Sequence, residues 1–402
     1  MTGKIFTGNF TQQEPIPEDA INSAIEVMRS GRLHRYNVAE GEVSETALLE
    51  IEFAEYMGSA YCLSCASGGY AMHIALRAAG VSSGDPVLTN GFTLSPVPGA
   101  IDNAGGKPVL VESTEDLVID LEDLERKILS SGSKFLLLSH MRGHLVDMDA
   151  LCEIVDRHNV ALIEDCAHTM GASWKGRKSG TYGVAACFST QTYKHVNSGE
   201  GGFLTTNDKE LMARAVIRSG SYMLFGRHAA APDVSTYTDI KLDSPNYSGR
   251  MDNLRAAILR PQLKRLDENR DRWNRRYQIL ESAVSGINGL FVPARPDEEV
   301  YVGSSFQFLA TALNAKQIQS FISACQSRGV ELKWFGSADP VAYTSRHTSW
   351  RYVSEQSLPR TDKILDKLCD IRVPLSFSED DYQLIGEIIA EEYVAIQLDE
   401  TA

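Results

Sequence analysis

Short apolar runs that alternate with amphipathic stretches occupy the chain from about residue 60 to residue 219. The runs are YCLSC, PVLTN, KPVLVE, KFLLLSH, VALIED, GVAACFS and GFLTTN. Continuous apolar runs are typical of strands that are buried on both faces, because a strand with one solvated face alternates apolar and polar residues. Alternation of such strands with helices favours a parallel arrangement. The sequence therefore predicts an α/β fold with a mainly parallel sheet.

The stretches between and around these runs predict the helices and the domain boundary. Helices are expected at 17–30, 42–57, 69–80, 95–104, 121–131, 147–158 and 208–219, and later at 315–329 and 379–396. A charged segment with helical periodicity predicts one long helix over 251–285, which would lead to a second domain. A chain of 402 residues is too long for one ordinary core. We expect a large domain at 1–265 and a smaller one at 266–402.

Charge and cysteine usage exclude several classes of protein. The net charge of -14 and the lack of a Lys/Arg run argue against binding to nucleic acid or to an anionic membrane. No apolar run approaches the roughly 20 residues that cross a bilayer, and the N-terminus lacks a signal-peptide core, so a cytoplasmic location is expected. Cys62 and Cys65 form a CxxC without a second pair at zinc spacing, which indicates reduced, buried strand cysteines and no metal site.

The first motif that suggests chemistry is CASGGYAMHIAL, which spans 65–76. A strand ends, Ser67, Gly68 and Gly69 form a turn, and an amphipathic helix begins. Small residues let the backbone approach an anion, and the free N–H groups and the dipole of the helix N-terminus favour a phosphate. Taken alone, a glycine pair in front of a helix is more often a tight turn without a ligand.

The second motif is VALIEDCAHTMGA, in which Asp165 ends a strongly apolar strand. The carboxyl ends of strands are where α/β sheets place ligands, and a carboxylate there needs a partner. A protonated pyridine nitrogen would satisfy it. The alternative is that Asp165 caps the next helix and that His168 is an ordinary surface or core histidine.

The third motif is ACFSTQTYKHVNSGEGGFLTTND, in which Lys194 lies in a polar loop after an apolar strand. A lysine that forms a Schiff base needs a partly desolvated setting, and such a loop could provide it. Taken alone, Lys194 would be interpreted as a solvated surface group, as most lysines are. The GEGG sequence is not the GxGxxG dinucleotide fingerprint.

The order of these motifs resembles the DegT/DnrJ/EryC1/StrS family of sugar and cyclitol aminotransferases, which depend on pyridoxal phosphate (PLP). The resemblance runs from LEIEFAEYMGSAYCLSCASGGYAMHIAL through GDPVLTNGFTLS, IEDCAHTMGA and FSTQTYKHVNSGEGGFLTTND to RMDNLRAAILRPQL. It implies the fold of PLP-dependent transferases of type I, which is the aspartate aminotransferase-like fold. A large domain with a mainly parallel sheet would then precede a smaller C-terminal α+β domain.

The resemblance also implies roles for individual residues. Lys194 would carry the cofactor as a Schiff base and act as general base, Asp165 would hold the pyridine nitrogen, and His168 would lie beside the ring. The phosphate-binding positions correspond to Gly68, Gly69 and Ser189. Gln191 matches the cyclitol and aminohydroxybenzoate branch and is a candidate substrate residue. Family members are dimers that pass an amino group from glutamate or glutamine to a keto-sugar or keto-cyclitol.

The sequence departs from the family pattern at three positions of the cofactor site. Gly69 replaces a threonine of the phosphate turn. Leu94 stands where the family has an aromatic residue stacked on the cofactor, so that nearby Phe92 is the candidate for stacking. The asparagine that the partner subunit usually contributes is missing from NYSGRM, which offers Ser248, or Asn246 if the loop has an insertion.

The C-terminal segment from Tyr343 to Arg351 is also unusual, since it gathers His347, Trp350 and two arginines. Arg346 and Arg351 are predicted to form a clamp for a carboxylate or phosphate of the acceptor, because guanidinium groups donate bidentate hydrogen bonds. The alternative is a surface loop with solvated arginines.

Two other functions remain open on the same sequence. One is a PLP-dependent lyase, dehydratase or cyclase on the same scaffold, although the family's sugar dehydratase has histidine where this chain has Lys194. The other is a non-catalytic regulator. Neither a helix-turn-helix pattern nor a basic patch supports it, and three intact motifs argue for catalysis.

Overall fold

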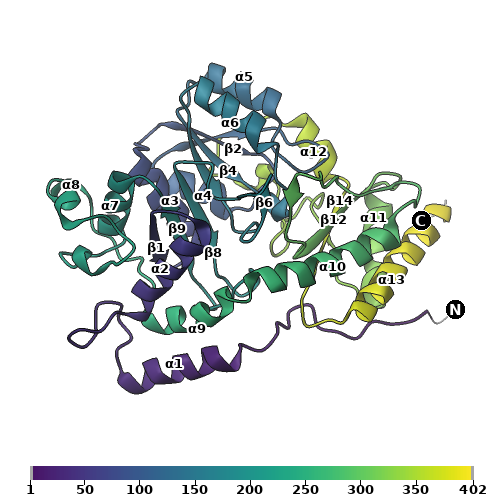
Figure 1. The fold of residues 1–402 in the computed structure, drawn as a ribbon. Helices are drawn as coiled ribbons and strands as arrows, with labels where there is room; N and C mark the ends of the chain where they lie inside the picture. The colour runs from purple at the N-terminus through teal and green to yellow at the C-terminus, as the bar shows by residue number, and fades with distance from the viewer. Residues whose placement is uncertain (1–2, 400–402) are drawn as a thin grey trace.

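A seven-stranded sheet forms the centre of the computed structural model, which describes residues 3–399 (Figure 1). Each predicted apolar run contains one of its strands: β1 (Tyr61–Cys65), β2 (Pro86–Asn90), β3 (Lys107–Val111), β4 (Phe135–Ser139), β5 (Ala161–Asp165), β8 (Ala185–Ser189) and β9 (Gly202–Thr206). The strand order is β1-β9-β8-β5-β4-β2-β3. Only β9 runs antiparallel to its neighbours, and the other pairs in the sheet are parallel. The predicted α/β fold with a mainly parallel sheet is confirmed.

Helices cover both faces of this sheet, because successive strand residues point to opposite faces. Leu137 of β4 packs in a core with α3 (Gly68–Ala79), α4 (Pro96–Asn103) and α7 (Lys209–Arg218). Its neighbours Leu136 and Leu138 pack on the other side with α5 (Leu121–Ser131) and α6 (Met148–Arg157). On that same side, α2 (Glu45–Met57) and α9 (Asn253–Leu263) cover the β8–β9 end. The continuous apolar character of the runs follows from this two-sided burial.

The segment that we predicted as one long helix over 251–285 is two helices, so this prediction is wrong. Helix α9 ends at Leu263 and α10 spans Leu266–Val284. Pro261 lacks an N–H group and clashes with the preceding turn, which weakens the last turn of α9. The predicted domain boundary between residues 265 and 266 falls at this break. The division into 1–265 and 266–402 stays a prediction.

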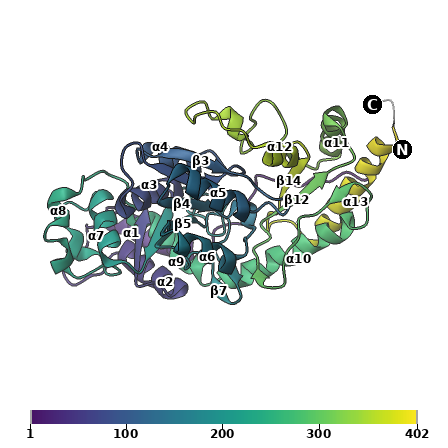
Figure 2. The ribbon, with the colours of Figure 1, turned by 90° about the horizontal axis from the view of Figure 1, so that it is seen from above.

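A second sheet lies at the other end of α10 (Figure 2). It is antiparallel, with the order β10-β12-β14-β13, and its strands are β10 (Leu290–Phe291), β12 (Ser305–Ala310), β13 (Lys333–Trp334) and β14 (Leu368–Arg372). Helices α11 (Ala315–Ser327), α12 (Pro359–Leu365) and α13 (Glu379–Leu398) accompany it. The N-terminal segment also packs here, since Phe6 and Phe10 make edge contacts with Phe377. It then leads to α1 (Glu18–Ser30), which packs against α9.

Smaller elements complete the described chain. A three-stranded sheet has the order β11-β6-β7 and joins β11 (Glu299–Val300) to β6 (Ser173–Trp174) and β7 (Arg177–Lys178). A four-residue helix, α8 (Ile240–Asp243), follows α7, and 3-10 turns lie at Met141–Gly143, Phe225–Arg227, Val234–Tyr237 and His347–Ser349.

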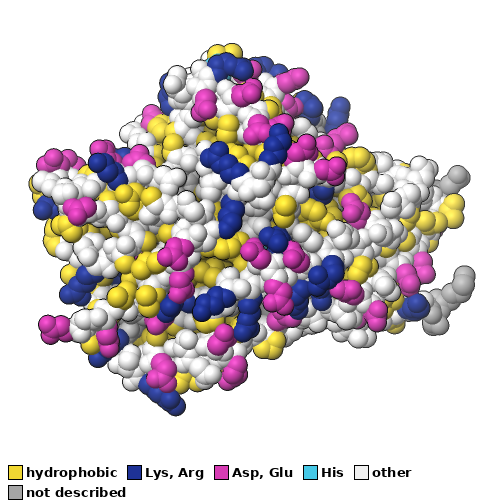
Figure 3. Space-filling view, viewed as in Figure 1, with side chains coloured by type: hydrophobic (Ala, Val, Ile, Leu, Met, Phe, Trp, Pro, Cys, Tyr) yellow, Lys and Arg dark blue, Asp and Glu magenta, His cyan; other side chains and the backbone are white. Residues whose placement is uncertain are grey.

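Surface charge, helix hydropathy and cysteine burial can each be compared with what the sequence predicts. On the face drawn in Figure 3, acidic and basic side chains are interspersed. No helix within residues 3–399 is long and apolar enough to span a bilayer. Cys62 and Cys65 are free thiols buried in β1, as the sequence predicted.

Candidate active site

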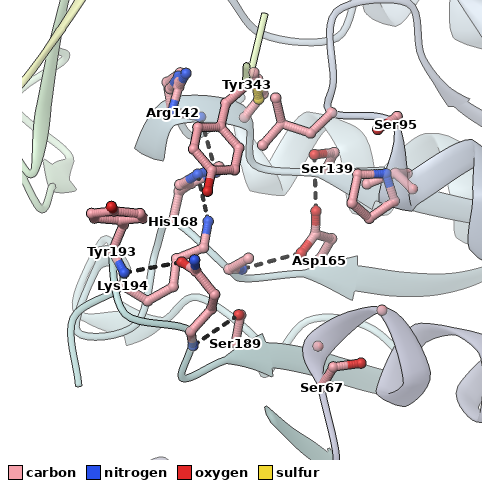
Figure 4. A pocket seen from close by; sticks show the side chains of 18 of the residues that line it. Ser67, Ser95, Ser139, Arg142, Asp165, His168, Ser189, Tyr193, Lys194 and Tyr343 are labelled. Carbon is pink, nitrogen blue, oxygen red and sulfur yellow. Dashed lines mark hydrogen bonds between the residues drawn. The ribbon is translucent and has the colours of Figure 1, made fainter. Parts of the chain in front are cut away.

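A cavity of about 480 Å³ lies at the carboxyl ends of β4, β5 and β8, beside the N-terminus of α3 (Figure 4). This is the edge of a parallel sheet where ligands bind. The cavity brings together the predicted residues Gly68, Gly69, Asp165, His168, Ser189, Gln191 and Lys194. Leu94, which stands where the family has an aromatic residue, also lines it.

One end of the cavity is formed by the first turn of α3. The Ser67 side chain caps the helix by accepting a hydrogen bond from the Tyr70 N–H (3.1 Å). The N–H groups of Gly68 and Gly69, in the first turn, have no partner within the helix. A Cβ atom on Gly68 would lie 2.9 Å from the Ser189 Cβ, so only glycine allows this approach of the turn to β8. The backbone N–H groups of this turn therefore form a site for an anion, with the hydroxyl of Ser189 beside it.

The floor of the cavity carries the buried carboxylate of Asp165, at the end of β5. Its Oδ2 accepts a hydrogen bond from the Ser139 hydroxyl (3.1 Å), and its Oδ1 accepts one from the Ala167 N–H (3.1 Å). Burial raises the pKa of the Asp165 carboxyl, which these two hydrogen bonds and the Lys194 charge counteract. A buried carboxylate in this state gains from a cationic partner in the cavity.

Lys194 extends into the cavity from the loop after β8, where its Nζ lies 2.8 Å from Nε2 of His168. Desolvation lowers the pKa of Lys194 to about 7, with the charges of Arg142 and Arg372 acting in the same direction and that of Asp165 opposing them. Burial and the Lys194 and Arg142 charges also lower the pKa of His168 well below its usual range. Near neutral pH, Lys194 is therefore partly an uncharged amine next to a neutral imidazole.

The hydrogen bonds assign the tautomer of His168. The Arg142 N–H points at Nδ1 (3.4 Å), so Nδ1 accepts and the ring proton lies on Nε2. The Nε2–H group then donates to the Lys194 amine in its uncharged form. Arg142 holds this position with a φ of 56°, in the left-handed region, where a non-glycine residue is strained.

The other end of the cavity contains residues that the sequence analysis missed: Arg142, Arg372 and Tyr193. Arg142 follows the carboxyl end of β4, and the rule that strand ends carry ligands could have identified it. Arg372 lies on β14 of the second sheet, and its sequence neighbours give no signal that it faces this cavity. Of the unusual C-terminal segment from Tyr343 to Arg351, Tyr343 and Ser345 reach the cavity wall, together with the preceding Ala342.

Phe92, which we predicted to stack on the cofactor, is not in the cavity wall. Its side chain is buried and packs edge-on against Phe335, at 5.1 Å between ring centroids. It belongs to an apolar cluster with Leu117 and Met141. The prediction of a stacking role is therefore wrong. Ser248 is exposed and does not line the cavity of its own chain.

The predicted clamp of Arg346 and Arg351 is also wrong. The Arg346 guanidinium forms ion pairs with Asp362 of α12 (2.8 Å) and with Asp366, the residue that follows α12 (2.6 Å). Arg351 is exposed and lies outside the cavity wall. His347 likewise pairs with Asp362, at 3.0 Å. These side chains attach the segment to α12 and leave Arg346 no free donor pair for a substrate.

Beneath the cavity, His140, Glu164 and Cys166 offer atoms close enough to hold a metal ion. Glu164 nevertheless accepts hydrogen bonds from the N–H groups of Gly180 and Tyr182, both at 2.8 Å. His140 lies 3.1 Å from the same carboxylate. These contacts account for the burial of Glu164 without an ion.

Comparison with known proteins identifies one family and several related proteins. The model of the DegT/DnrJ/EryC1/StrS aminotransferase family matches residues 15–390. The "Pleiotropic regulatory protein" of Geobacillus stearothermophilus is 30% identical over 390 residues, which are 95% of this chain and 96% of that protein. The "dTDP-3-amino-3,4,6-trideoxy-alpha-D-glucose transaminase" of Micromonospora megalomicea subsp. nigra is 37% identical over 220 residues, covering 54% of this chain and 55% of that protein. The crystal structure of 3-amino-5-hydroxybenzoic acid synthase superposes with a TM-score of 0.81 at 24% identity, covering 98% of this chain and 100% of that one.

Proposed function

Because the chain belongs to the DegT/DnrJ/EryC1/StrS aminotransferase family and is a PLP-dependent aminotransferase, we propose that it transfers an amino group from glutamate or glutamine to a keto-sugar, keto-cyclitol or related small keto compound. The observation that carries the proposal is the Lys194 amine, whose pKa is lowered to about 7 in a cavity shared with Asp165 and the α3 N-terminus. An uncharged amine is what attachment to a carbonyl requires.

The residues of the cavity fit PLP at three points. The unpaired N–H groups of Gly68 and Gly69 and the Ser189 hydroxyl would hold the phosphate. Asp165 would accept a hydrogen bond from the protonated pyridine nitrogen, which supplies the cationic partner that its raised pKa calls for. Lys194 would hold the cofactor through Nζ. Bound PLP supplies an electron-withdrawing ring that makes the substrate Cα–H acidic.

The protein's own groups would then move and position protons. The Lys194 Nζ, whose pKa is lowered to about 7, would take a proton from the substrate carbon and return it one carbon away. His168 would orient the Lys194 Nζ through its Nε2–H group. Asp165 would keep the ring nitrogen protonated, and its hydrogen bonds from Ser139 and Ala167 fix its orientation.

The choice of donor and acceptor is supported by the names of relatives. One relative, from Streptomyces lividus, is named L-glutamine:2-deoxy-scyllo-inosose aminotransferase, and it is 31% identical over 62% of this chain. We propose that Gln191, at the cavity wall, contacts the substrate.

We also propose a cytoplasmic homodimer in which each subunit completes the other's site. Ser248 is exposed and away from its own cavity, which leaves it free to approach the phosphate of a second subunit. The seven cysteines are free thiols, as expected in a reducing compartment.

The test is a single-turnover experiment on PLP-loaded protein. Addition of l-glutamate or l-glutamine should convert the cofactor to the pyridoxamine form, seen by absorbance, with release of the matching 2-oxo acid. Release of the oxo acid separates amino transfer from a lyase reaction. Lys194→Ala should lose both signals, and a second lysine captured by borohydride in that variant would contradict the assignment of Lys194.

A further inference from the structure

One face of the second sheet is polar although its strands are buried. Along β12 and β14, Phe306, Phe308 and Ile371 point into the apolar core beneath α11 and α13. Residues that alternate with them share the opposite face: Ser305, Gln307, Lys333, Asp370 and Arg372. The pairing places Lys333 and Gln307 directly on either side of Asp370. Such a face is costly to bury unless its groups find partners.

Part of this polar face is satisfied within the protein. Gln307 donates to Asp370 Oδ1 (2.7 Å), and its Oε1 lies 3.0 Å from Nε2 of His144. The second oxygen of Asp370 lies 3.0 Å from an Nη atom of Arg142, as an ion pair without the geometry of a hydrogen bond. Asp370 is therefore committed to Gln307 and Arg142.

Two cations of this face remain without a hydrogen-bonding partner. The Lys333 Nζ is buried and has no hydrogen bond within residues 3–399. Arg372 lines the cavity, and across the described chain no hydrogen bond or ion pair involves its guanidinium. Instead its Cζ lies 3.5 Å from the centroid of the Tyr193 ring and 5.4 Å from that of Tyr343. Stacking on an aromatic ring leaves the in-plane N–H donors of a guanidinium free for a ligand.

The charges at this end of the cavity do not balance. Three cations, Arg142, Arg372 and Lys333, lie around the carboxylate of Asp370, and the charge of Glu331 acts on Lys333 less strongly than that of Asp370. Burial lowers the pKa of Lys333 to about 8, which leaves this amine largely protonated at neutral pH. The excess of positive charge in a desolvated wall favours an anionic group of the ligand.

We propose that Arg372, with Lys333 and Arg142 behind it, binds the carboxylate of the amino donor. The inference rests on the proposed function, since it assigns the donor's amino group to the Lys194 end of the cavity and its carboxylate to the Arg372 end. An amino acid always carries this carboxylate, whereas a hydroxyl-rich keto acceptor need not. Tyr193 orients Arg372 so that its planar donors meet the two carboxylate oxygens.

The first test measures binding without turnover. Maleate, an unreactive dicarboxylate, is titrated calorimetrically into the PLP-loaded protein. Arg372→Gln should raise the Kd for maleate by roughly tenfold or more, as expected for loss of a charge-assisted bidentate contact. Lys333→Met should raise the Kd by a smaller factor. Arg351→Gln, an exposed arginine outside the cavity, is the matched control and should leave the Kd unchanged. An Arg372→Gln protein that is folded, loaded with PLP and as tight for maleate as the wild type would overturn the proposal.

The second test asks whether the bound carboxylate is the donor's. Maleate should compete with l-glutamate or l-glutamine in the conversion of the cofactor, and Arg372→Gln should raise the donor concentration for half-maximal rate. Maleate that binds without slowing either donor would overturn the assignment to the donor. If neither donor converts the wild-type cofactor, the proposed function fails, while the calorimetry still decides whether Arg372 binds a carboxylate.

Discussion

The lowered pKa of Lys194 leads to a quantitative prediction for cofactor capture. With a pKa of about 7 instead of the ordinary 10.5, about half of the Lys194 amine is uncharged at pH 7, against roughly one in 3000 for a solvated lysine. Because only the uncharged amine attacks a carbonyl, attachment of PLP to the apoprotein should become faster up to about pH 7 and then level off. A solvated lysine would continue to gain about three orders of magnitude between pH 7 and pH 10.

The assay removes PLP from the protein, adds it back at a series of pH values, and reduces the product with borohydride at timed intervals. Mass spectrometry gives the rate at Lys194. Nα-acetyl-lysine, treated in parallel, reports how PLP itself depends on pH, so the ratio of the two rates isolates the protein's contribution. This ratio should fall steadily above pH 7. A constant ratio from pH 7 to pH 10 would refute the reasoning, because it would show a solvated Lys194.

Further substitutions test the rest of the site and the fold. Asp165→Asn should keep PLP bound but slow turnover by roughly two orders of magnitude or more, and near-normal turnover would show that the carboxylate only caps a helix. Gly69→Thr should be tolerated, since a Cβ atom there meets only ordinary contacts at 3.9 and 4.0 Å. Its hydroxyl should tighten PLP binding by about tenfold, measured by fluorescence titration. Ser248→Ala should weaken PLP retention in a dimer, and sedimentation that finds an active monomer would contradict this. Glu50→Gln should lower the free energy of unfolding by about 3–5 kcal/mol in urea denaturation, because it leaves Arg35 buried without its ion pair.

The strands of the large sheet could be predicted because each is an uninterrupted apolar run, and burial on both faces produces that pattern directly. The break between α9 and α10 could not be predicted, since apolar periodicity continues on both sides of Pro261. Local pattern therefore favoured one helix, whereas the chain turns at residues 264 and 265, between α9 and α10.

Part of the candidate site could likewise be predicted from the sequence, and part could not. Asp165 and Lys194 end or follow recognisable strands, so their place at one sheet edge follows from the topology. Arg372 could not be predicted, because it enters the cavity from β14, which lies more than 150 residues after Lys194 in the chain. Arg346 was assigned wrongly for a related reason. Its partners Asp362 and Asp366 are visible in the sequence, but the fold alone brings them to Arg346.

The packing of the N-terminal segment restricts how the two sheets can move. Phe6 and Phe10 are held against Phe377 beside the second sheet, and the same segment continues into α1 on α9. The N-terminal segment therefore links the two sheets in addition to the α9–α10 connection and the pairing of β6 with β11. Rotation about the break alone would pull the aromatic rings apart. We expect this contact to oppose rotation of the second sheet about the α9–α10 break, since the three rings would have to separate.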